Sequence, residues 1–111
     1  MEKLPNGSNA FGFWENTPYG IVTDSLEECR KFKNSIPKKS VIQHIESMDF
    51  GISSTPMYDI FTGEEFRAGI YEDGPFTFPI DFLRYYKTQN IGIPYEYEDY
   101  LKSIGVGRVD L

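Results

Sequence analysis

Apolar residues in the first half of the chain recur with the period of a helix in two segments. Ser25 and Glu28 form a capping box ahead of residues 26–36, so a helix is predicted there that stops before Pro37. The apolar positions of residues 40–48 recur every three to four residues and predict a second helix. A strand is the alternative for this second segment, because valine and isoleucine also favour sheets.

Short aromatic, β-branched or alternating runs predict strands elsewhere in the chain. The predicted strands are residues 11–15, 19–23, 57–61, 65–72 and 76–78. Asp73-Gly74 is a strong signal for a hairpin between the last two strands. Pro75 favours an edge position for the last strand, because proline cannot donate a hydrogen bond to a neighbouring strand. In the strand before it, the alternation places Tyr71 on the face opposite the apolar residues.

Two more helices are predicted near the end of the chain, over residues 79–87 and 94–104, and a glycine ends the second. Together these elements predict an α+β fold, in which a small antiparallel sheet in a β-meander packs with about four short helices. The 111 residues fit a single domain, residues 1–111. Residues 1–10 are expected to form a flexible lead-in, and residues 105–111 a frayed tail.

Acidic residues concentrate in the second half of the chain. The net charge is −6, and between His44 and Leu101 there are eleven acidic residues and three basic ones. This surplus disfavours nucleic acid and membranes as partners and favours a basic protein, although a need for solubility explains it equally well. A single cysteine, Cys29, together with the lack of a signal peptide or of a long apolar run, is expected of a cytoplasmic protein.

The sequence offers little for catalysis. The strongest candidate for a catalytic pair is Cys29 as nucleophile with His44 as base, but Cys29 lies on the apolar stripe of its predicted helix. One histidine and one cysteine make no zinc site, and no stretch has the spacing of a calcium or phosphate loop. Clustered acids are the remaining option, yet each has a simpler role in a turn or a helix; these are Asp73, Asp81, Glu96 and Asp99. We therefore expect no catalytic residue, no metal, no cofactor and no enzyme.

An excess of aromatic residues is left once the predicted core is assigned. The tyrosines that fall off the apolar stripes are Tyr58, Tyr71, Tyr85 and Tyr95. Tyrosine is favoured at protein interfaces, and nearby carboxylates would suit a partner rich in lysine and arginine. The alternative is that these rings lie flat over a small core with their hydroxyls in water. The expected partner-binding residues are Tyr71, Glu72, Asp73, Asp81, Tyr85, Tyr95, Glu96 and Asp99.

Four stretches of the chain carry a resemblance to a known group of proteins. They read YDIFTGE (58–64), AGIYEDG (68–74), FTFPIDFLRYY (76–86) and GIPYEYE (92–98). Over residues 41–102 the chain resembles small bacterial immunity proteins of contact-dependent growth inhibition and related toxin systems. The resemblance implies a protein that binds the C-terminal toxin domain of a sibling cell's effector and blocks its active site, and it assigns no role to any single residue. Many such toxins are nucleases, whose surfaces are basic.

The expected function is therefore that of an immunity protein that neutralises a cognate toxin domain, a basic nuclease, by steric and electrostatic occlusion. The alternative is a regulatory or scaffolding module whose partner is not a toxin, and a small hydrolase that uses clustered acids is the third hypothesis. An edge strand at residues 76–78 would also be able to pair with another chain.

Overall fold

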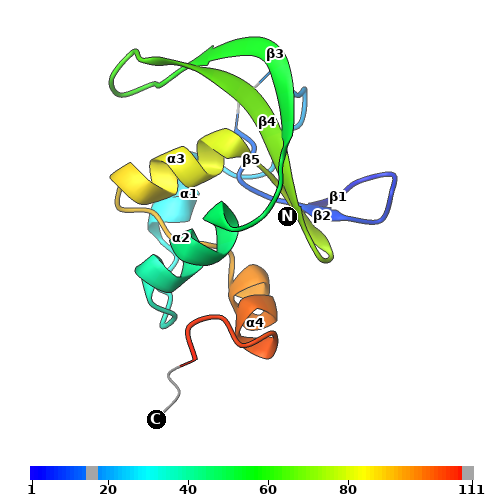
Figure 1. The fold of residues 1–111 in the computed structure, drawn as a ribbon, viewed down its shortest axis with the longest axis vertical. Coiled ribbons are helices and arrows are strands. Elements are labelled where there is room, and N and C mark those ends of the chain that lie inside the picture. The colour runs from blue at the N-terminus through cyan, green and yellow to red at the C-terminus, as the bar shows by residue number, and fades with distance from the viewer. Residues whose placement is uncertain (15–17, 109–111) are drawn as a thin grey trace.

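The computed structural model describes residues 1–14 and 18–108, which form a sheet packed against helices (Figure 1). The strands are β1 (Glu2–Lys3), β2 (Asn9–Ala10), β3 (Gly51–Tyr58), β4 (Glu65–Asp73) and β5 (Phe76–Pro79). The helices are α1 (Leu26–Arg30), α2 (Lys38–Glu46), α3 (Ile80–Thr88) and α4 (Tyr95–Ser103). The predicted α+β class is confirmed.

The sheet is mixed and not purely antiparallel as predicted. Its strand order is β1-β2-β5-β4-β3, and β2 pairs with β5 in parallel whereas the other neighbours are antiparallel. The predicted edge position of residues 76–78 is therefore wrong. Pro75 lacks a donor, but its carbonyl still accepts a hydrogen bond from Asn9 N at 2.8 Å, and Phe11 N donates to Thr77 O at 3.1 Å. These bonds give β5 a neighbour on both sides.

Both ends of the described chain pack against the fold. Residues 1–10 form the β1–β2 hairpin at the margin of the sheet, where a flexible lead-in was predicted. After α4, Val106 N donates to Leu101 O at 2.9 Å across a glycine with a positive φ, which is a common way to end a helix. Residues 105–108 therefore turn back onto the helix end, and residues 109–111 of the predicted frayed tail lie outside the described residues.

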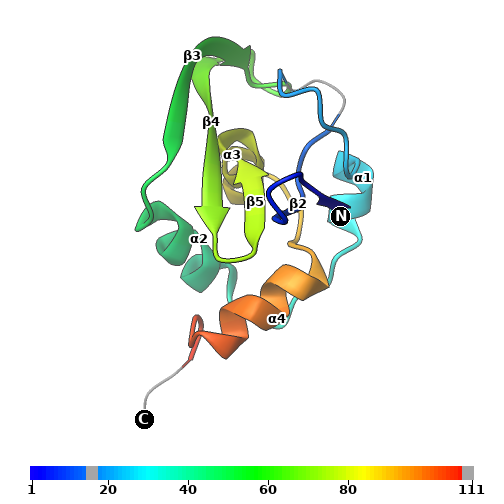
Figure 2. The same cartoon turned by 90° about the vertical axis from the view of Figure 1, so that its right-hand side faces the viewer.

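The helices cover one face of the sheet (Figure 2). α3 lies behind β4 and β5, with α2 and α1 on either side, and α4 crosses beneath the β4–β5 hairpin. The connection between β5 and α3 has no loop, because Pro79 is both the last residue of the strand and the N-cap of the helix. No helix among residues 1–14 and 18–108 is long and apolar enough to cross a membrane.

Local sequence signals predicted where the helices lie more accurately than they predicted the residues at which the helices begin and end. The Ser25 hydroxyl accepts a hydrogen bond from Glu28 N at 3.1 Å, as the capping box predicts, but α1 already ends at Arg30. Residues 40–46 are helical, so the alternative of a strand is wrong. α2 begins two residues earlier than predicted, at Lys38, and ends two residues earlier, at Glu46. The predicted helices near the end of the chain correspond to α3 and α4.

The first two predicted strands are absent from the described residues. Residues 11–14 and 19–23 have no strand structure, and residue 15 lies outside the described chain. One backbone hydrogen bond joins the two segments, from Thr23 N to Phe13 O at 2.8 Å. The aromatic run is buried in the interior, where Phe13 is fully covered, and so its composition reflects packing of a loop and not a sheet.

Aromatic side chains from several elements meet around Phe78, which is fully buried on β5. Its ring stacks on Phe11 at a centroid distance of 4.9 Å and on Tyr71 at 5.4 Å. Tyr97 of α4 lies 5.4 Å away, and Phe82 of α3 lies 6.0 Å away. Aromatic rings bury large areas and pack with defined geometry, so this cluster holds the sheet against α3 and α4.

We expect Phe78→Ala to lower the free energy of unfolding by about 3–5 kcal/mol, because it removes a ring from the centre of this cluster and leaves a cavity. Ile104→Ala is the control, since Ile104 is about half exposed and its loss is expected to change stability by about 0.5 kcal/mol or less. Urea denaturation followed by fluorescence measures both. Equal losses for the two variants would contradict the central place of Phe78.

Candidate functional site

The structure separates the eight predicted partner-binding residues into a buried half and an exposed half. The buried ones are Tyr71, Asp73, Asp81 and Tyr85. The exposed ones are Glu72 on β4 and Tyr95, Glu96 and Asp99 on α4. A partner that docks on the folded surface cannot reach the buried half. The expectation of one acidic and phenolic surface made by all eight residues is therefore wrong.

Tyr71 is buried because its side chain lies on the face of β4 that the helices cover. The register places Tyr71 opposite Phe78, and its ring packs between Phe78 and Phe50, each at a centroid distance of 5.4 Å. Tyr85 is buried between Trp14 and the turn that follows β3, and its hydroxyl accepts a hydrogen bond from Ile60 N at 3.0 Å. The sequence predicted the alternation of β4 but not which face the helices cover.

Asp73 joins three elements in the interior. Its Oδ2 atom lies 2.9 Å from Nε2 of His44 on α2, and it accepts a hydrogen bond from the hydroxyl of Tyr97 on α4 at 2.6 Å. Burial raises the pKa of Tyr97 above its ordinary value, which keeps the phenol protonated as a donor. Burial likewise raises the pKa of Cys29 to about 12, so this thiol is not the thiolate that a Cys29–His44 dyad would need.

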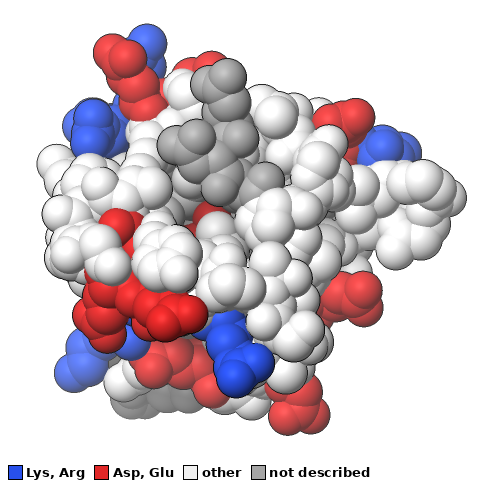
Figure 3. Space-filling view, turned by 90° about the horizontal axis from the view of Figure 1, so that it is seen from above, with Lys and Arg blue, Asp and Glu red and all other residues white. Residues whose placement is uncertain are grey.

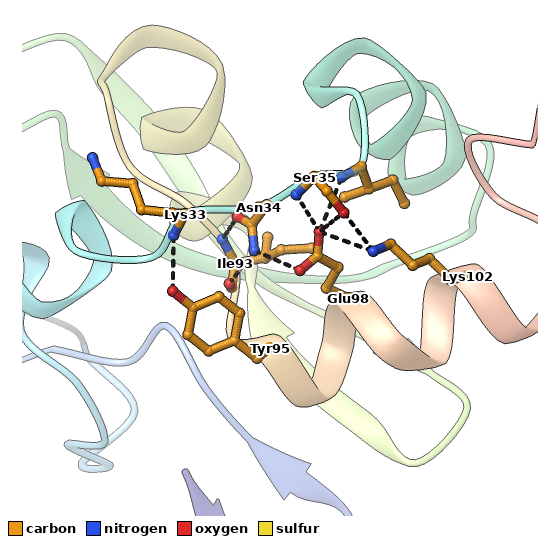
Figure 4. Close-up of polar contacts among 8 residues, drawn as sticks. Lys33, Asn34, Ser35, Ile93, Tyr95, Glu98 and Lys102 are labelled. Carbon is orange, nitrogen blue, oxygen red and sulfur yellow. Dashed lines mark hydrogen bonds and ion pairs between the residues drawn. The ribbon is translucent and has the colours of Figure 1, made fainter.

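Glu98 on α4 is buried and holds the loop between α1 and α2 (Figure 4). Its Oε2 atom accepts hydrogen bonds from Ser35 N at 2.7 Å and Ile36 N at 3.0 Å, and Lys102 Nζ lies 3.7 Å away, as the i, i+4 spacing predicts. Burial alone would raise the pKa of Glu98. The hydrogen bonds from Ile36, Asn34 and Ser35 outweigh burial and hold the pKa below its ordinary value.

Asp81 is fully buried in the first turn of α3, and neither carboxylate oxygen has a hydrogen-bond partner among the described residues. Burial raises its pKa to about 7. A lone buried carboxyl group can take part in catalysis only if other functional side chains lie next to it. The described residues contain no cluster of three or more His, Cys, Asp or Glu side chains that could hold a metal ion.

A cavity of about 610 Å³ lies between the start of β3 and the middle of β4. We call it the β3–β4 groove. Its apolar walls include Phe50, Ile52 and Ile70, and Asp49 and Glu72 are its acidic lining residues. No lysine or arginine of the described residues lines it. The groove therefore combines an apolar interior with negative charge, and both acidic side chains are exposed.

The wall of the groove at Gly69 is fixed by a tyrosine from the N-terminal third. The hydroxyl of Tyr19 donates to Gly69 O and accepts from Gly69 N, each at 2.6 Å. A side chain at position 69 would collide with Ile80 of α3 and with the Gly51 carbonyl, 2.6 Å from a built Cβ atom. Only glycine leaves room here for the helix, the neighbouring strand and the phenol.

Large apolar side chains are exposed along β3 and the turn after it. We call these residues the β3 surface: Phe50, Ile52, Tyr58, Ile60 and Phe61. Among the described strands β3 forms one edge of the sheet and β1 the other, and the pairing of β3 with β4 is irregular between Ile52 and Pro56. Figure 3 views the molecule from the β3 end, and uncharged atoms cover much of this face, with most charged atoms toward its margin. Exposed apolar patches with polar surroundings are typical of binding surfaces.

Comparison with known protein families, with curated proteins and with solved structures finds no match to this chain. The resemblance to immunity proteins stays a prediction from the sequence. The β3 surface and the β3–β4 groove are the physical basis for a function. Sequence reasoning singled out only Tyr58 of the β3 surface, because isolated apolar residues in a strand do not reveal which side lacks a neighbour.

We expect Asp81→Asn to stabilise the protein at pH 8. The pKa of Asp81 rises from 3.8 to about 7 on folding, so the wild type loses stability as pH rises through this interval and stays less stable above it. The neutral amide removes this loss, which amounts to about 1.4 kcal/mol per pKa unit. Urea denaturation of both proteins from pH 4 to pH 8 measures the effect. A difference in stability that does not grow with pH would contradict the ionisation of Asp81.

We expect Glu98→Gln to destabilise the protein by about 1–3 kcal/mol at pH 7, because backbone donors of the loop between α1 and α2 lose their charged acceptor. The pKa of Glu98 is lower in the folded state, so its contribution is present above pH 4.5 and disappears as pH falls through the folded pKa. The two proteins should therefore converge in stability on acidification. Glu96→Gln, on the exposed side of α4, is the control and is expected to show neither effect.

Proposed function

We propose that this protein binds another protein through the β3 surface and the β3–β4 groove, and that the partner is basic where it contacts the groove. The observation that carries the proposal is the composition of the groove in the described part of the chain: apolar walls, two exposed carboxylates at Asp49 and Glu72, and no basic lining residue. A patch of this kind has little to attract an anion. It suits a partner that presents an apolar side chain flanked by lysine or arginine.

The parts of the surface have different roles in this binding. Ile52 and Phe50 are 64% and 48% exposed and supply apolar area that a partner can cover. Asp49 and Glu72 attract a cationic surface at long range and so accelerate association. The unpaired outer edge of β3 also offers backbone donors and acceptors to an extended segment, although Pro56 removes one donor.

The resemblance to immunity proteins supplies the class of partner. In this proposal the partner is the toxin domain of a sibling cell's effector, a basic nuclease, and the protein neutralises it in the cytoplasm by occlusion without turnover. The acidic surplus of residues 44–101 supports a basic partner. The apolar and acidic groove supports a steric and electrostatic mode of inhibition.

A regulatory or scaffolding module with a partner other than a toxin is the second candidate. Four acids of the acidic half are buried, and these are Asp59, Asp73, Asp81 and Glu98. The surface is therefore less acidic than the sequence predicts, which favours weaker steering by charge. The two candidates differ in salt dependence, since association with a strongly basic nuclease slows steeply as ionic strength rises.

The proposal predicts that a toxic domain is encoded next to this gene, and co-expression with that domain tests it. Cells that make the toxic domain should survive with the wild-type protein and should die with Ile52→Lys, which removes apolar contact and places a positive charge in the groove. Ile104→Lys is the matched control, because Ile104 is also exposed but lies at the end of α4. Rescue by Ile52→Lys as complete as that by the wild type would exclude the groove as the binding surface.

A pair of charge reversals distinguishes the effect of the groove on association from the effect of the acidic residues of α4. Glu72→Lys should slow association with the purified toxic domain by about tenfold, whereas Glu96→Lys, with the same change in charge, should slow it by about twofold or less. Stopped-flow or surface-plasmon measurements give these rates. Equal effects would mean that only the net charge of the protein guides the partner.

A further inference from the structure

Basic residues are concentrated in one short part of this acidic chain. Residues 29–45 contain no aspartate or glutamate, and they hold Arg30, Lys31, Lys33, Lys38 and Lys39. Among the described residues, none of these five forms an ion pair with a carboxylate, whereas the basic residues of α3 and Lys102 do. The segment from Arg30 to Lys39, between the end of α1 and the start of α2, is therefore locally cationic on a protein with a net charge of −6, and the nearest acids in the sequence are Glu27 and Glu28 in the first turn of α1.

Three of these cations line a second cavity, of about 330 Å³, which we call the basic pocket. Arg30, Lys33 and Lys38 come from the region between α1 and α2, and Tyr86, Ile91 and other residues come from α3 and the loop after it. Among residues 1–14 and 18–108, no carboxylate lines the pocket. Its volume is at the lower end of the range for small-molecule sites.

The position of Lys38 is fixed by two contacts from the opposite wall. Its Nζ atom donates a hydrogen bond to Gln89 O at 2.9 Å and lies 4.5 Å above the centre of the Tyr86 ring. The side chain is partly buried, and this burial lowers the pKa of Lys38. An ammonium group held in this way has already lost much of its side-chain freedom and part of its hydration, so binding an anion would cost it less.

Gly92 joins the two walls of the pocket. Its N–H donates to Cys29 O at 2.8 Å, and a Cβ atom at this position would lie 2.6 Å from Asn34 Oδ1 and 2.7 Å from Phe32 O. Asn34 adds two bonds to Ile93, from Nδ2 to the carbonyl at 3.0 Å and from the Ile93 N–H to Oδ1 at 2.9 Å. The walls are thus held by the Gly92 backbone and the Asn34 side chain, and not by the charged groups of Arg30 and Lys33.

The nearest buried carboxylate does not neutralise the pocket. Glu98 is occupied by the backbone of Ser35 and Ile36 and by Lys102, and the side chain of Lys33 extends away from these contacts (Figure 4). The pocket also adjoins the first residue of α2, a nine-residue helix with no acidic residue in its first turn. The positive end of this helix adds to the field of the three cations.

We propose that the basic pocket binds a small phosphoryl-bearing molecule, with Arg30, Lys33 and Lys38 around its phosphoryl oxygens. Phosphoryl groups offer several acceptor oxygens and a charge that two or three cations can match, and arginine and lysine are the usual residues that hold them. The pocket shares no lining residue with the β3–β4 groove. This proposal is therefore independent of the proposed protein partner.

Titration of the full chain with inorganic pyrophosphate, ADP and adenosine tests the proposal by calorimetry and by backbone amide NMR shifts. Pyrophosphate and ADP should bind saturably and shift the amides of Lys33, Lys38 and Gly92, and adenosine should do neither. Similar affinities for pyrophosphate and ADP would identify the phosphoryl group as the whole determinant. Affinity for ADP at least about tenfold higher would identify a nucleotide. Adenosine binding as tight as ADP, or no saturable binding of either phosphate, overturns the proposal.

A matched pair of lysines distinguishes a pocket from diffuse charge. Lys33→Gln should weaken pyrophosphate binding by about tenfold, because it removes a cation that lines the pocket. Lys31→Gln makes the same change in net charge two residues away, at an exposed side chain that does not line the pocket, and should weaken binding by about twofold or less. Equal losses for the two variants overturn the proposal. Both side chains are exposed, so neither change should affect folding.

Discussion

Aromatic packing around Phe78 is the constraint on which the rest of the structure depends. The ring contacts side chains from the segment after β2, from β4, from α3 and from α4, so one cluster sets how the sheet meets the helices. The same packing draws Tyr71 and Tyr97 into the interior. Tyrosine rings that the sequence would allow to contact a partner are thus buried in the core, because a short chain needs their area to bury enough apolar surface.

Burial of acidic residues changes the electrostatics of the molecule as much as burial of the tyrosines does. Asp59 pairs with Arg84, Asp73 with His44 and Tyr97, and Glu98 with the loop between α1 and α2. These carboxylates hold elements together and contribute little to the field outside. The surface that remains has two distinct regions, an apolar and acidic groove at β3 and a cationic pocket between α1 and α2.

Glu98 links the fold to the basic pocket. By accepting hydrogen bonds from consecutive backbone amides it fixes the loop that carries Lys33 and leads into Lys38. A buried acid thus organises a cationic site without lining it. The β3 surface is built differently, since its apolar residues lie on or next to an edge strand of the sheet and are left exposed there. One surface is supported by polar contacts, and the other results from the position of a strand in the sheet.

The sequence by itself determined the α+β class, the Ser25 cap, the Asp73-Gly74 hairpin and the helices that became α2, α3 and α4. These features depend on residues within one or two turns of each other, so their signals are local. Only the tertiary structure decided that β2 pairs with β5, that Tyr71 and Asp81 face inward, and that residues near positions 30 and 90 enclose a pocket. The physical reason is that each of these depends on contacts between distant parts of the chain, which periodicity and composition do not specify.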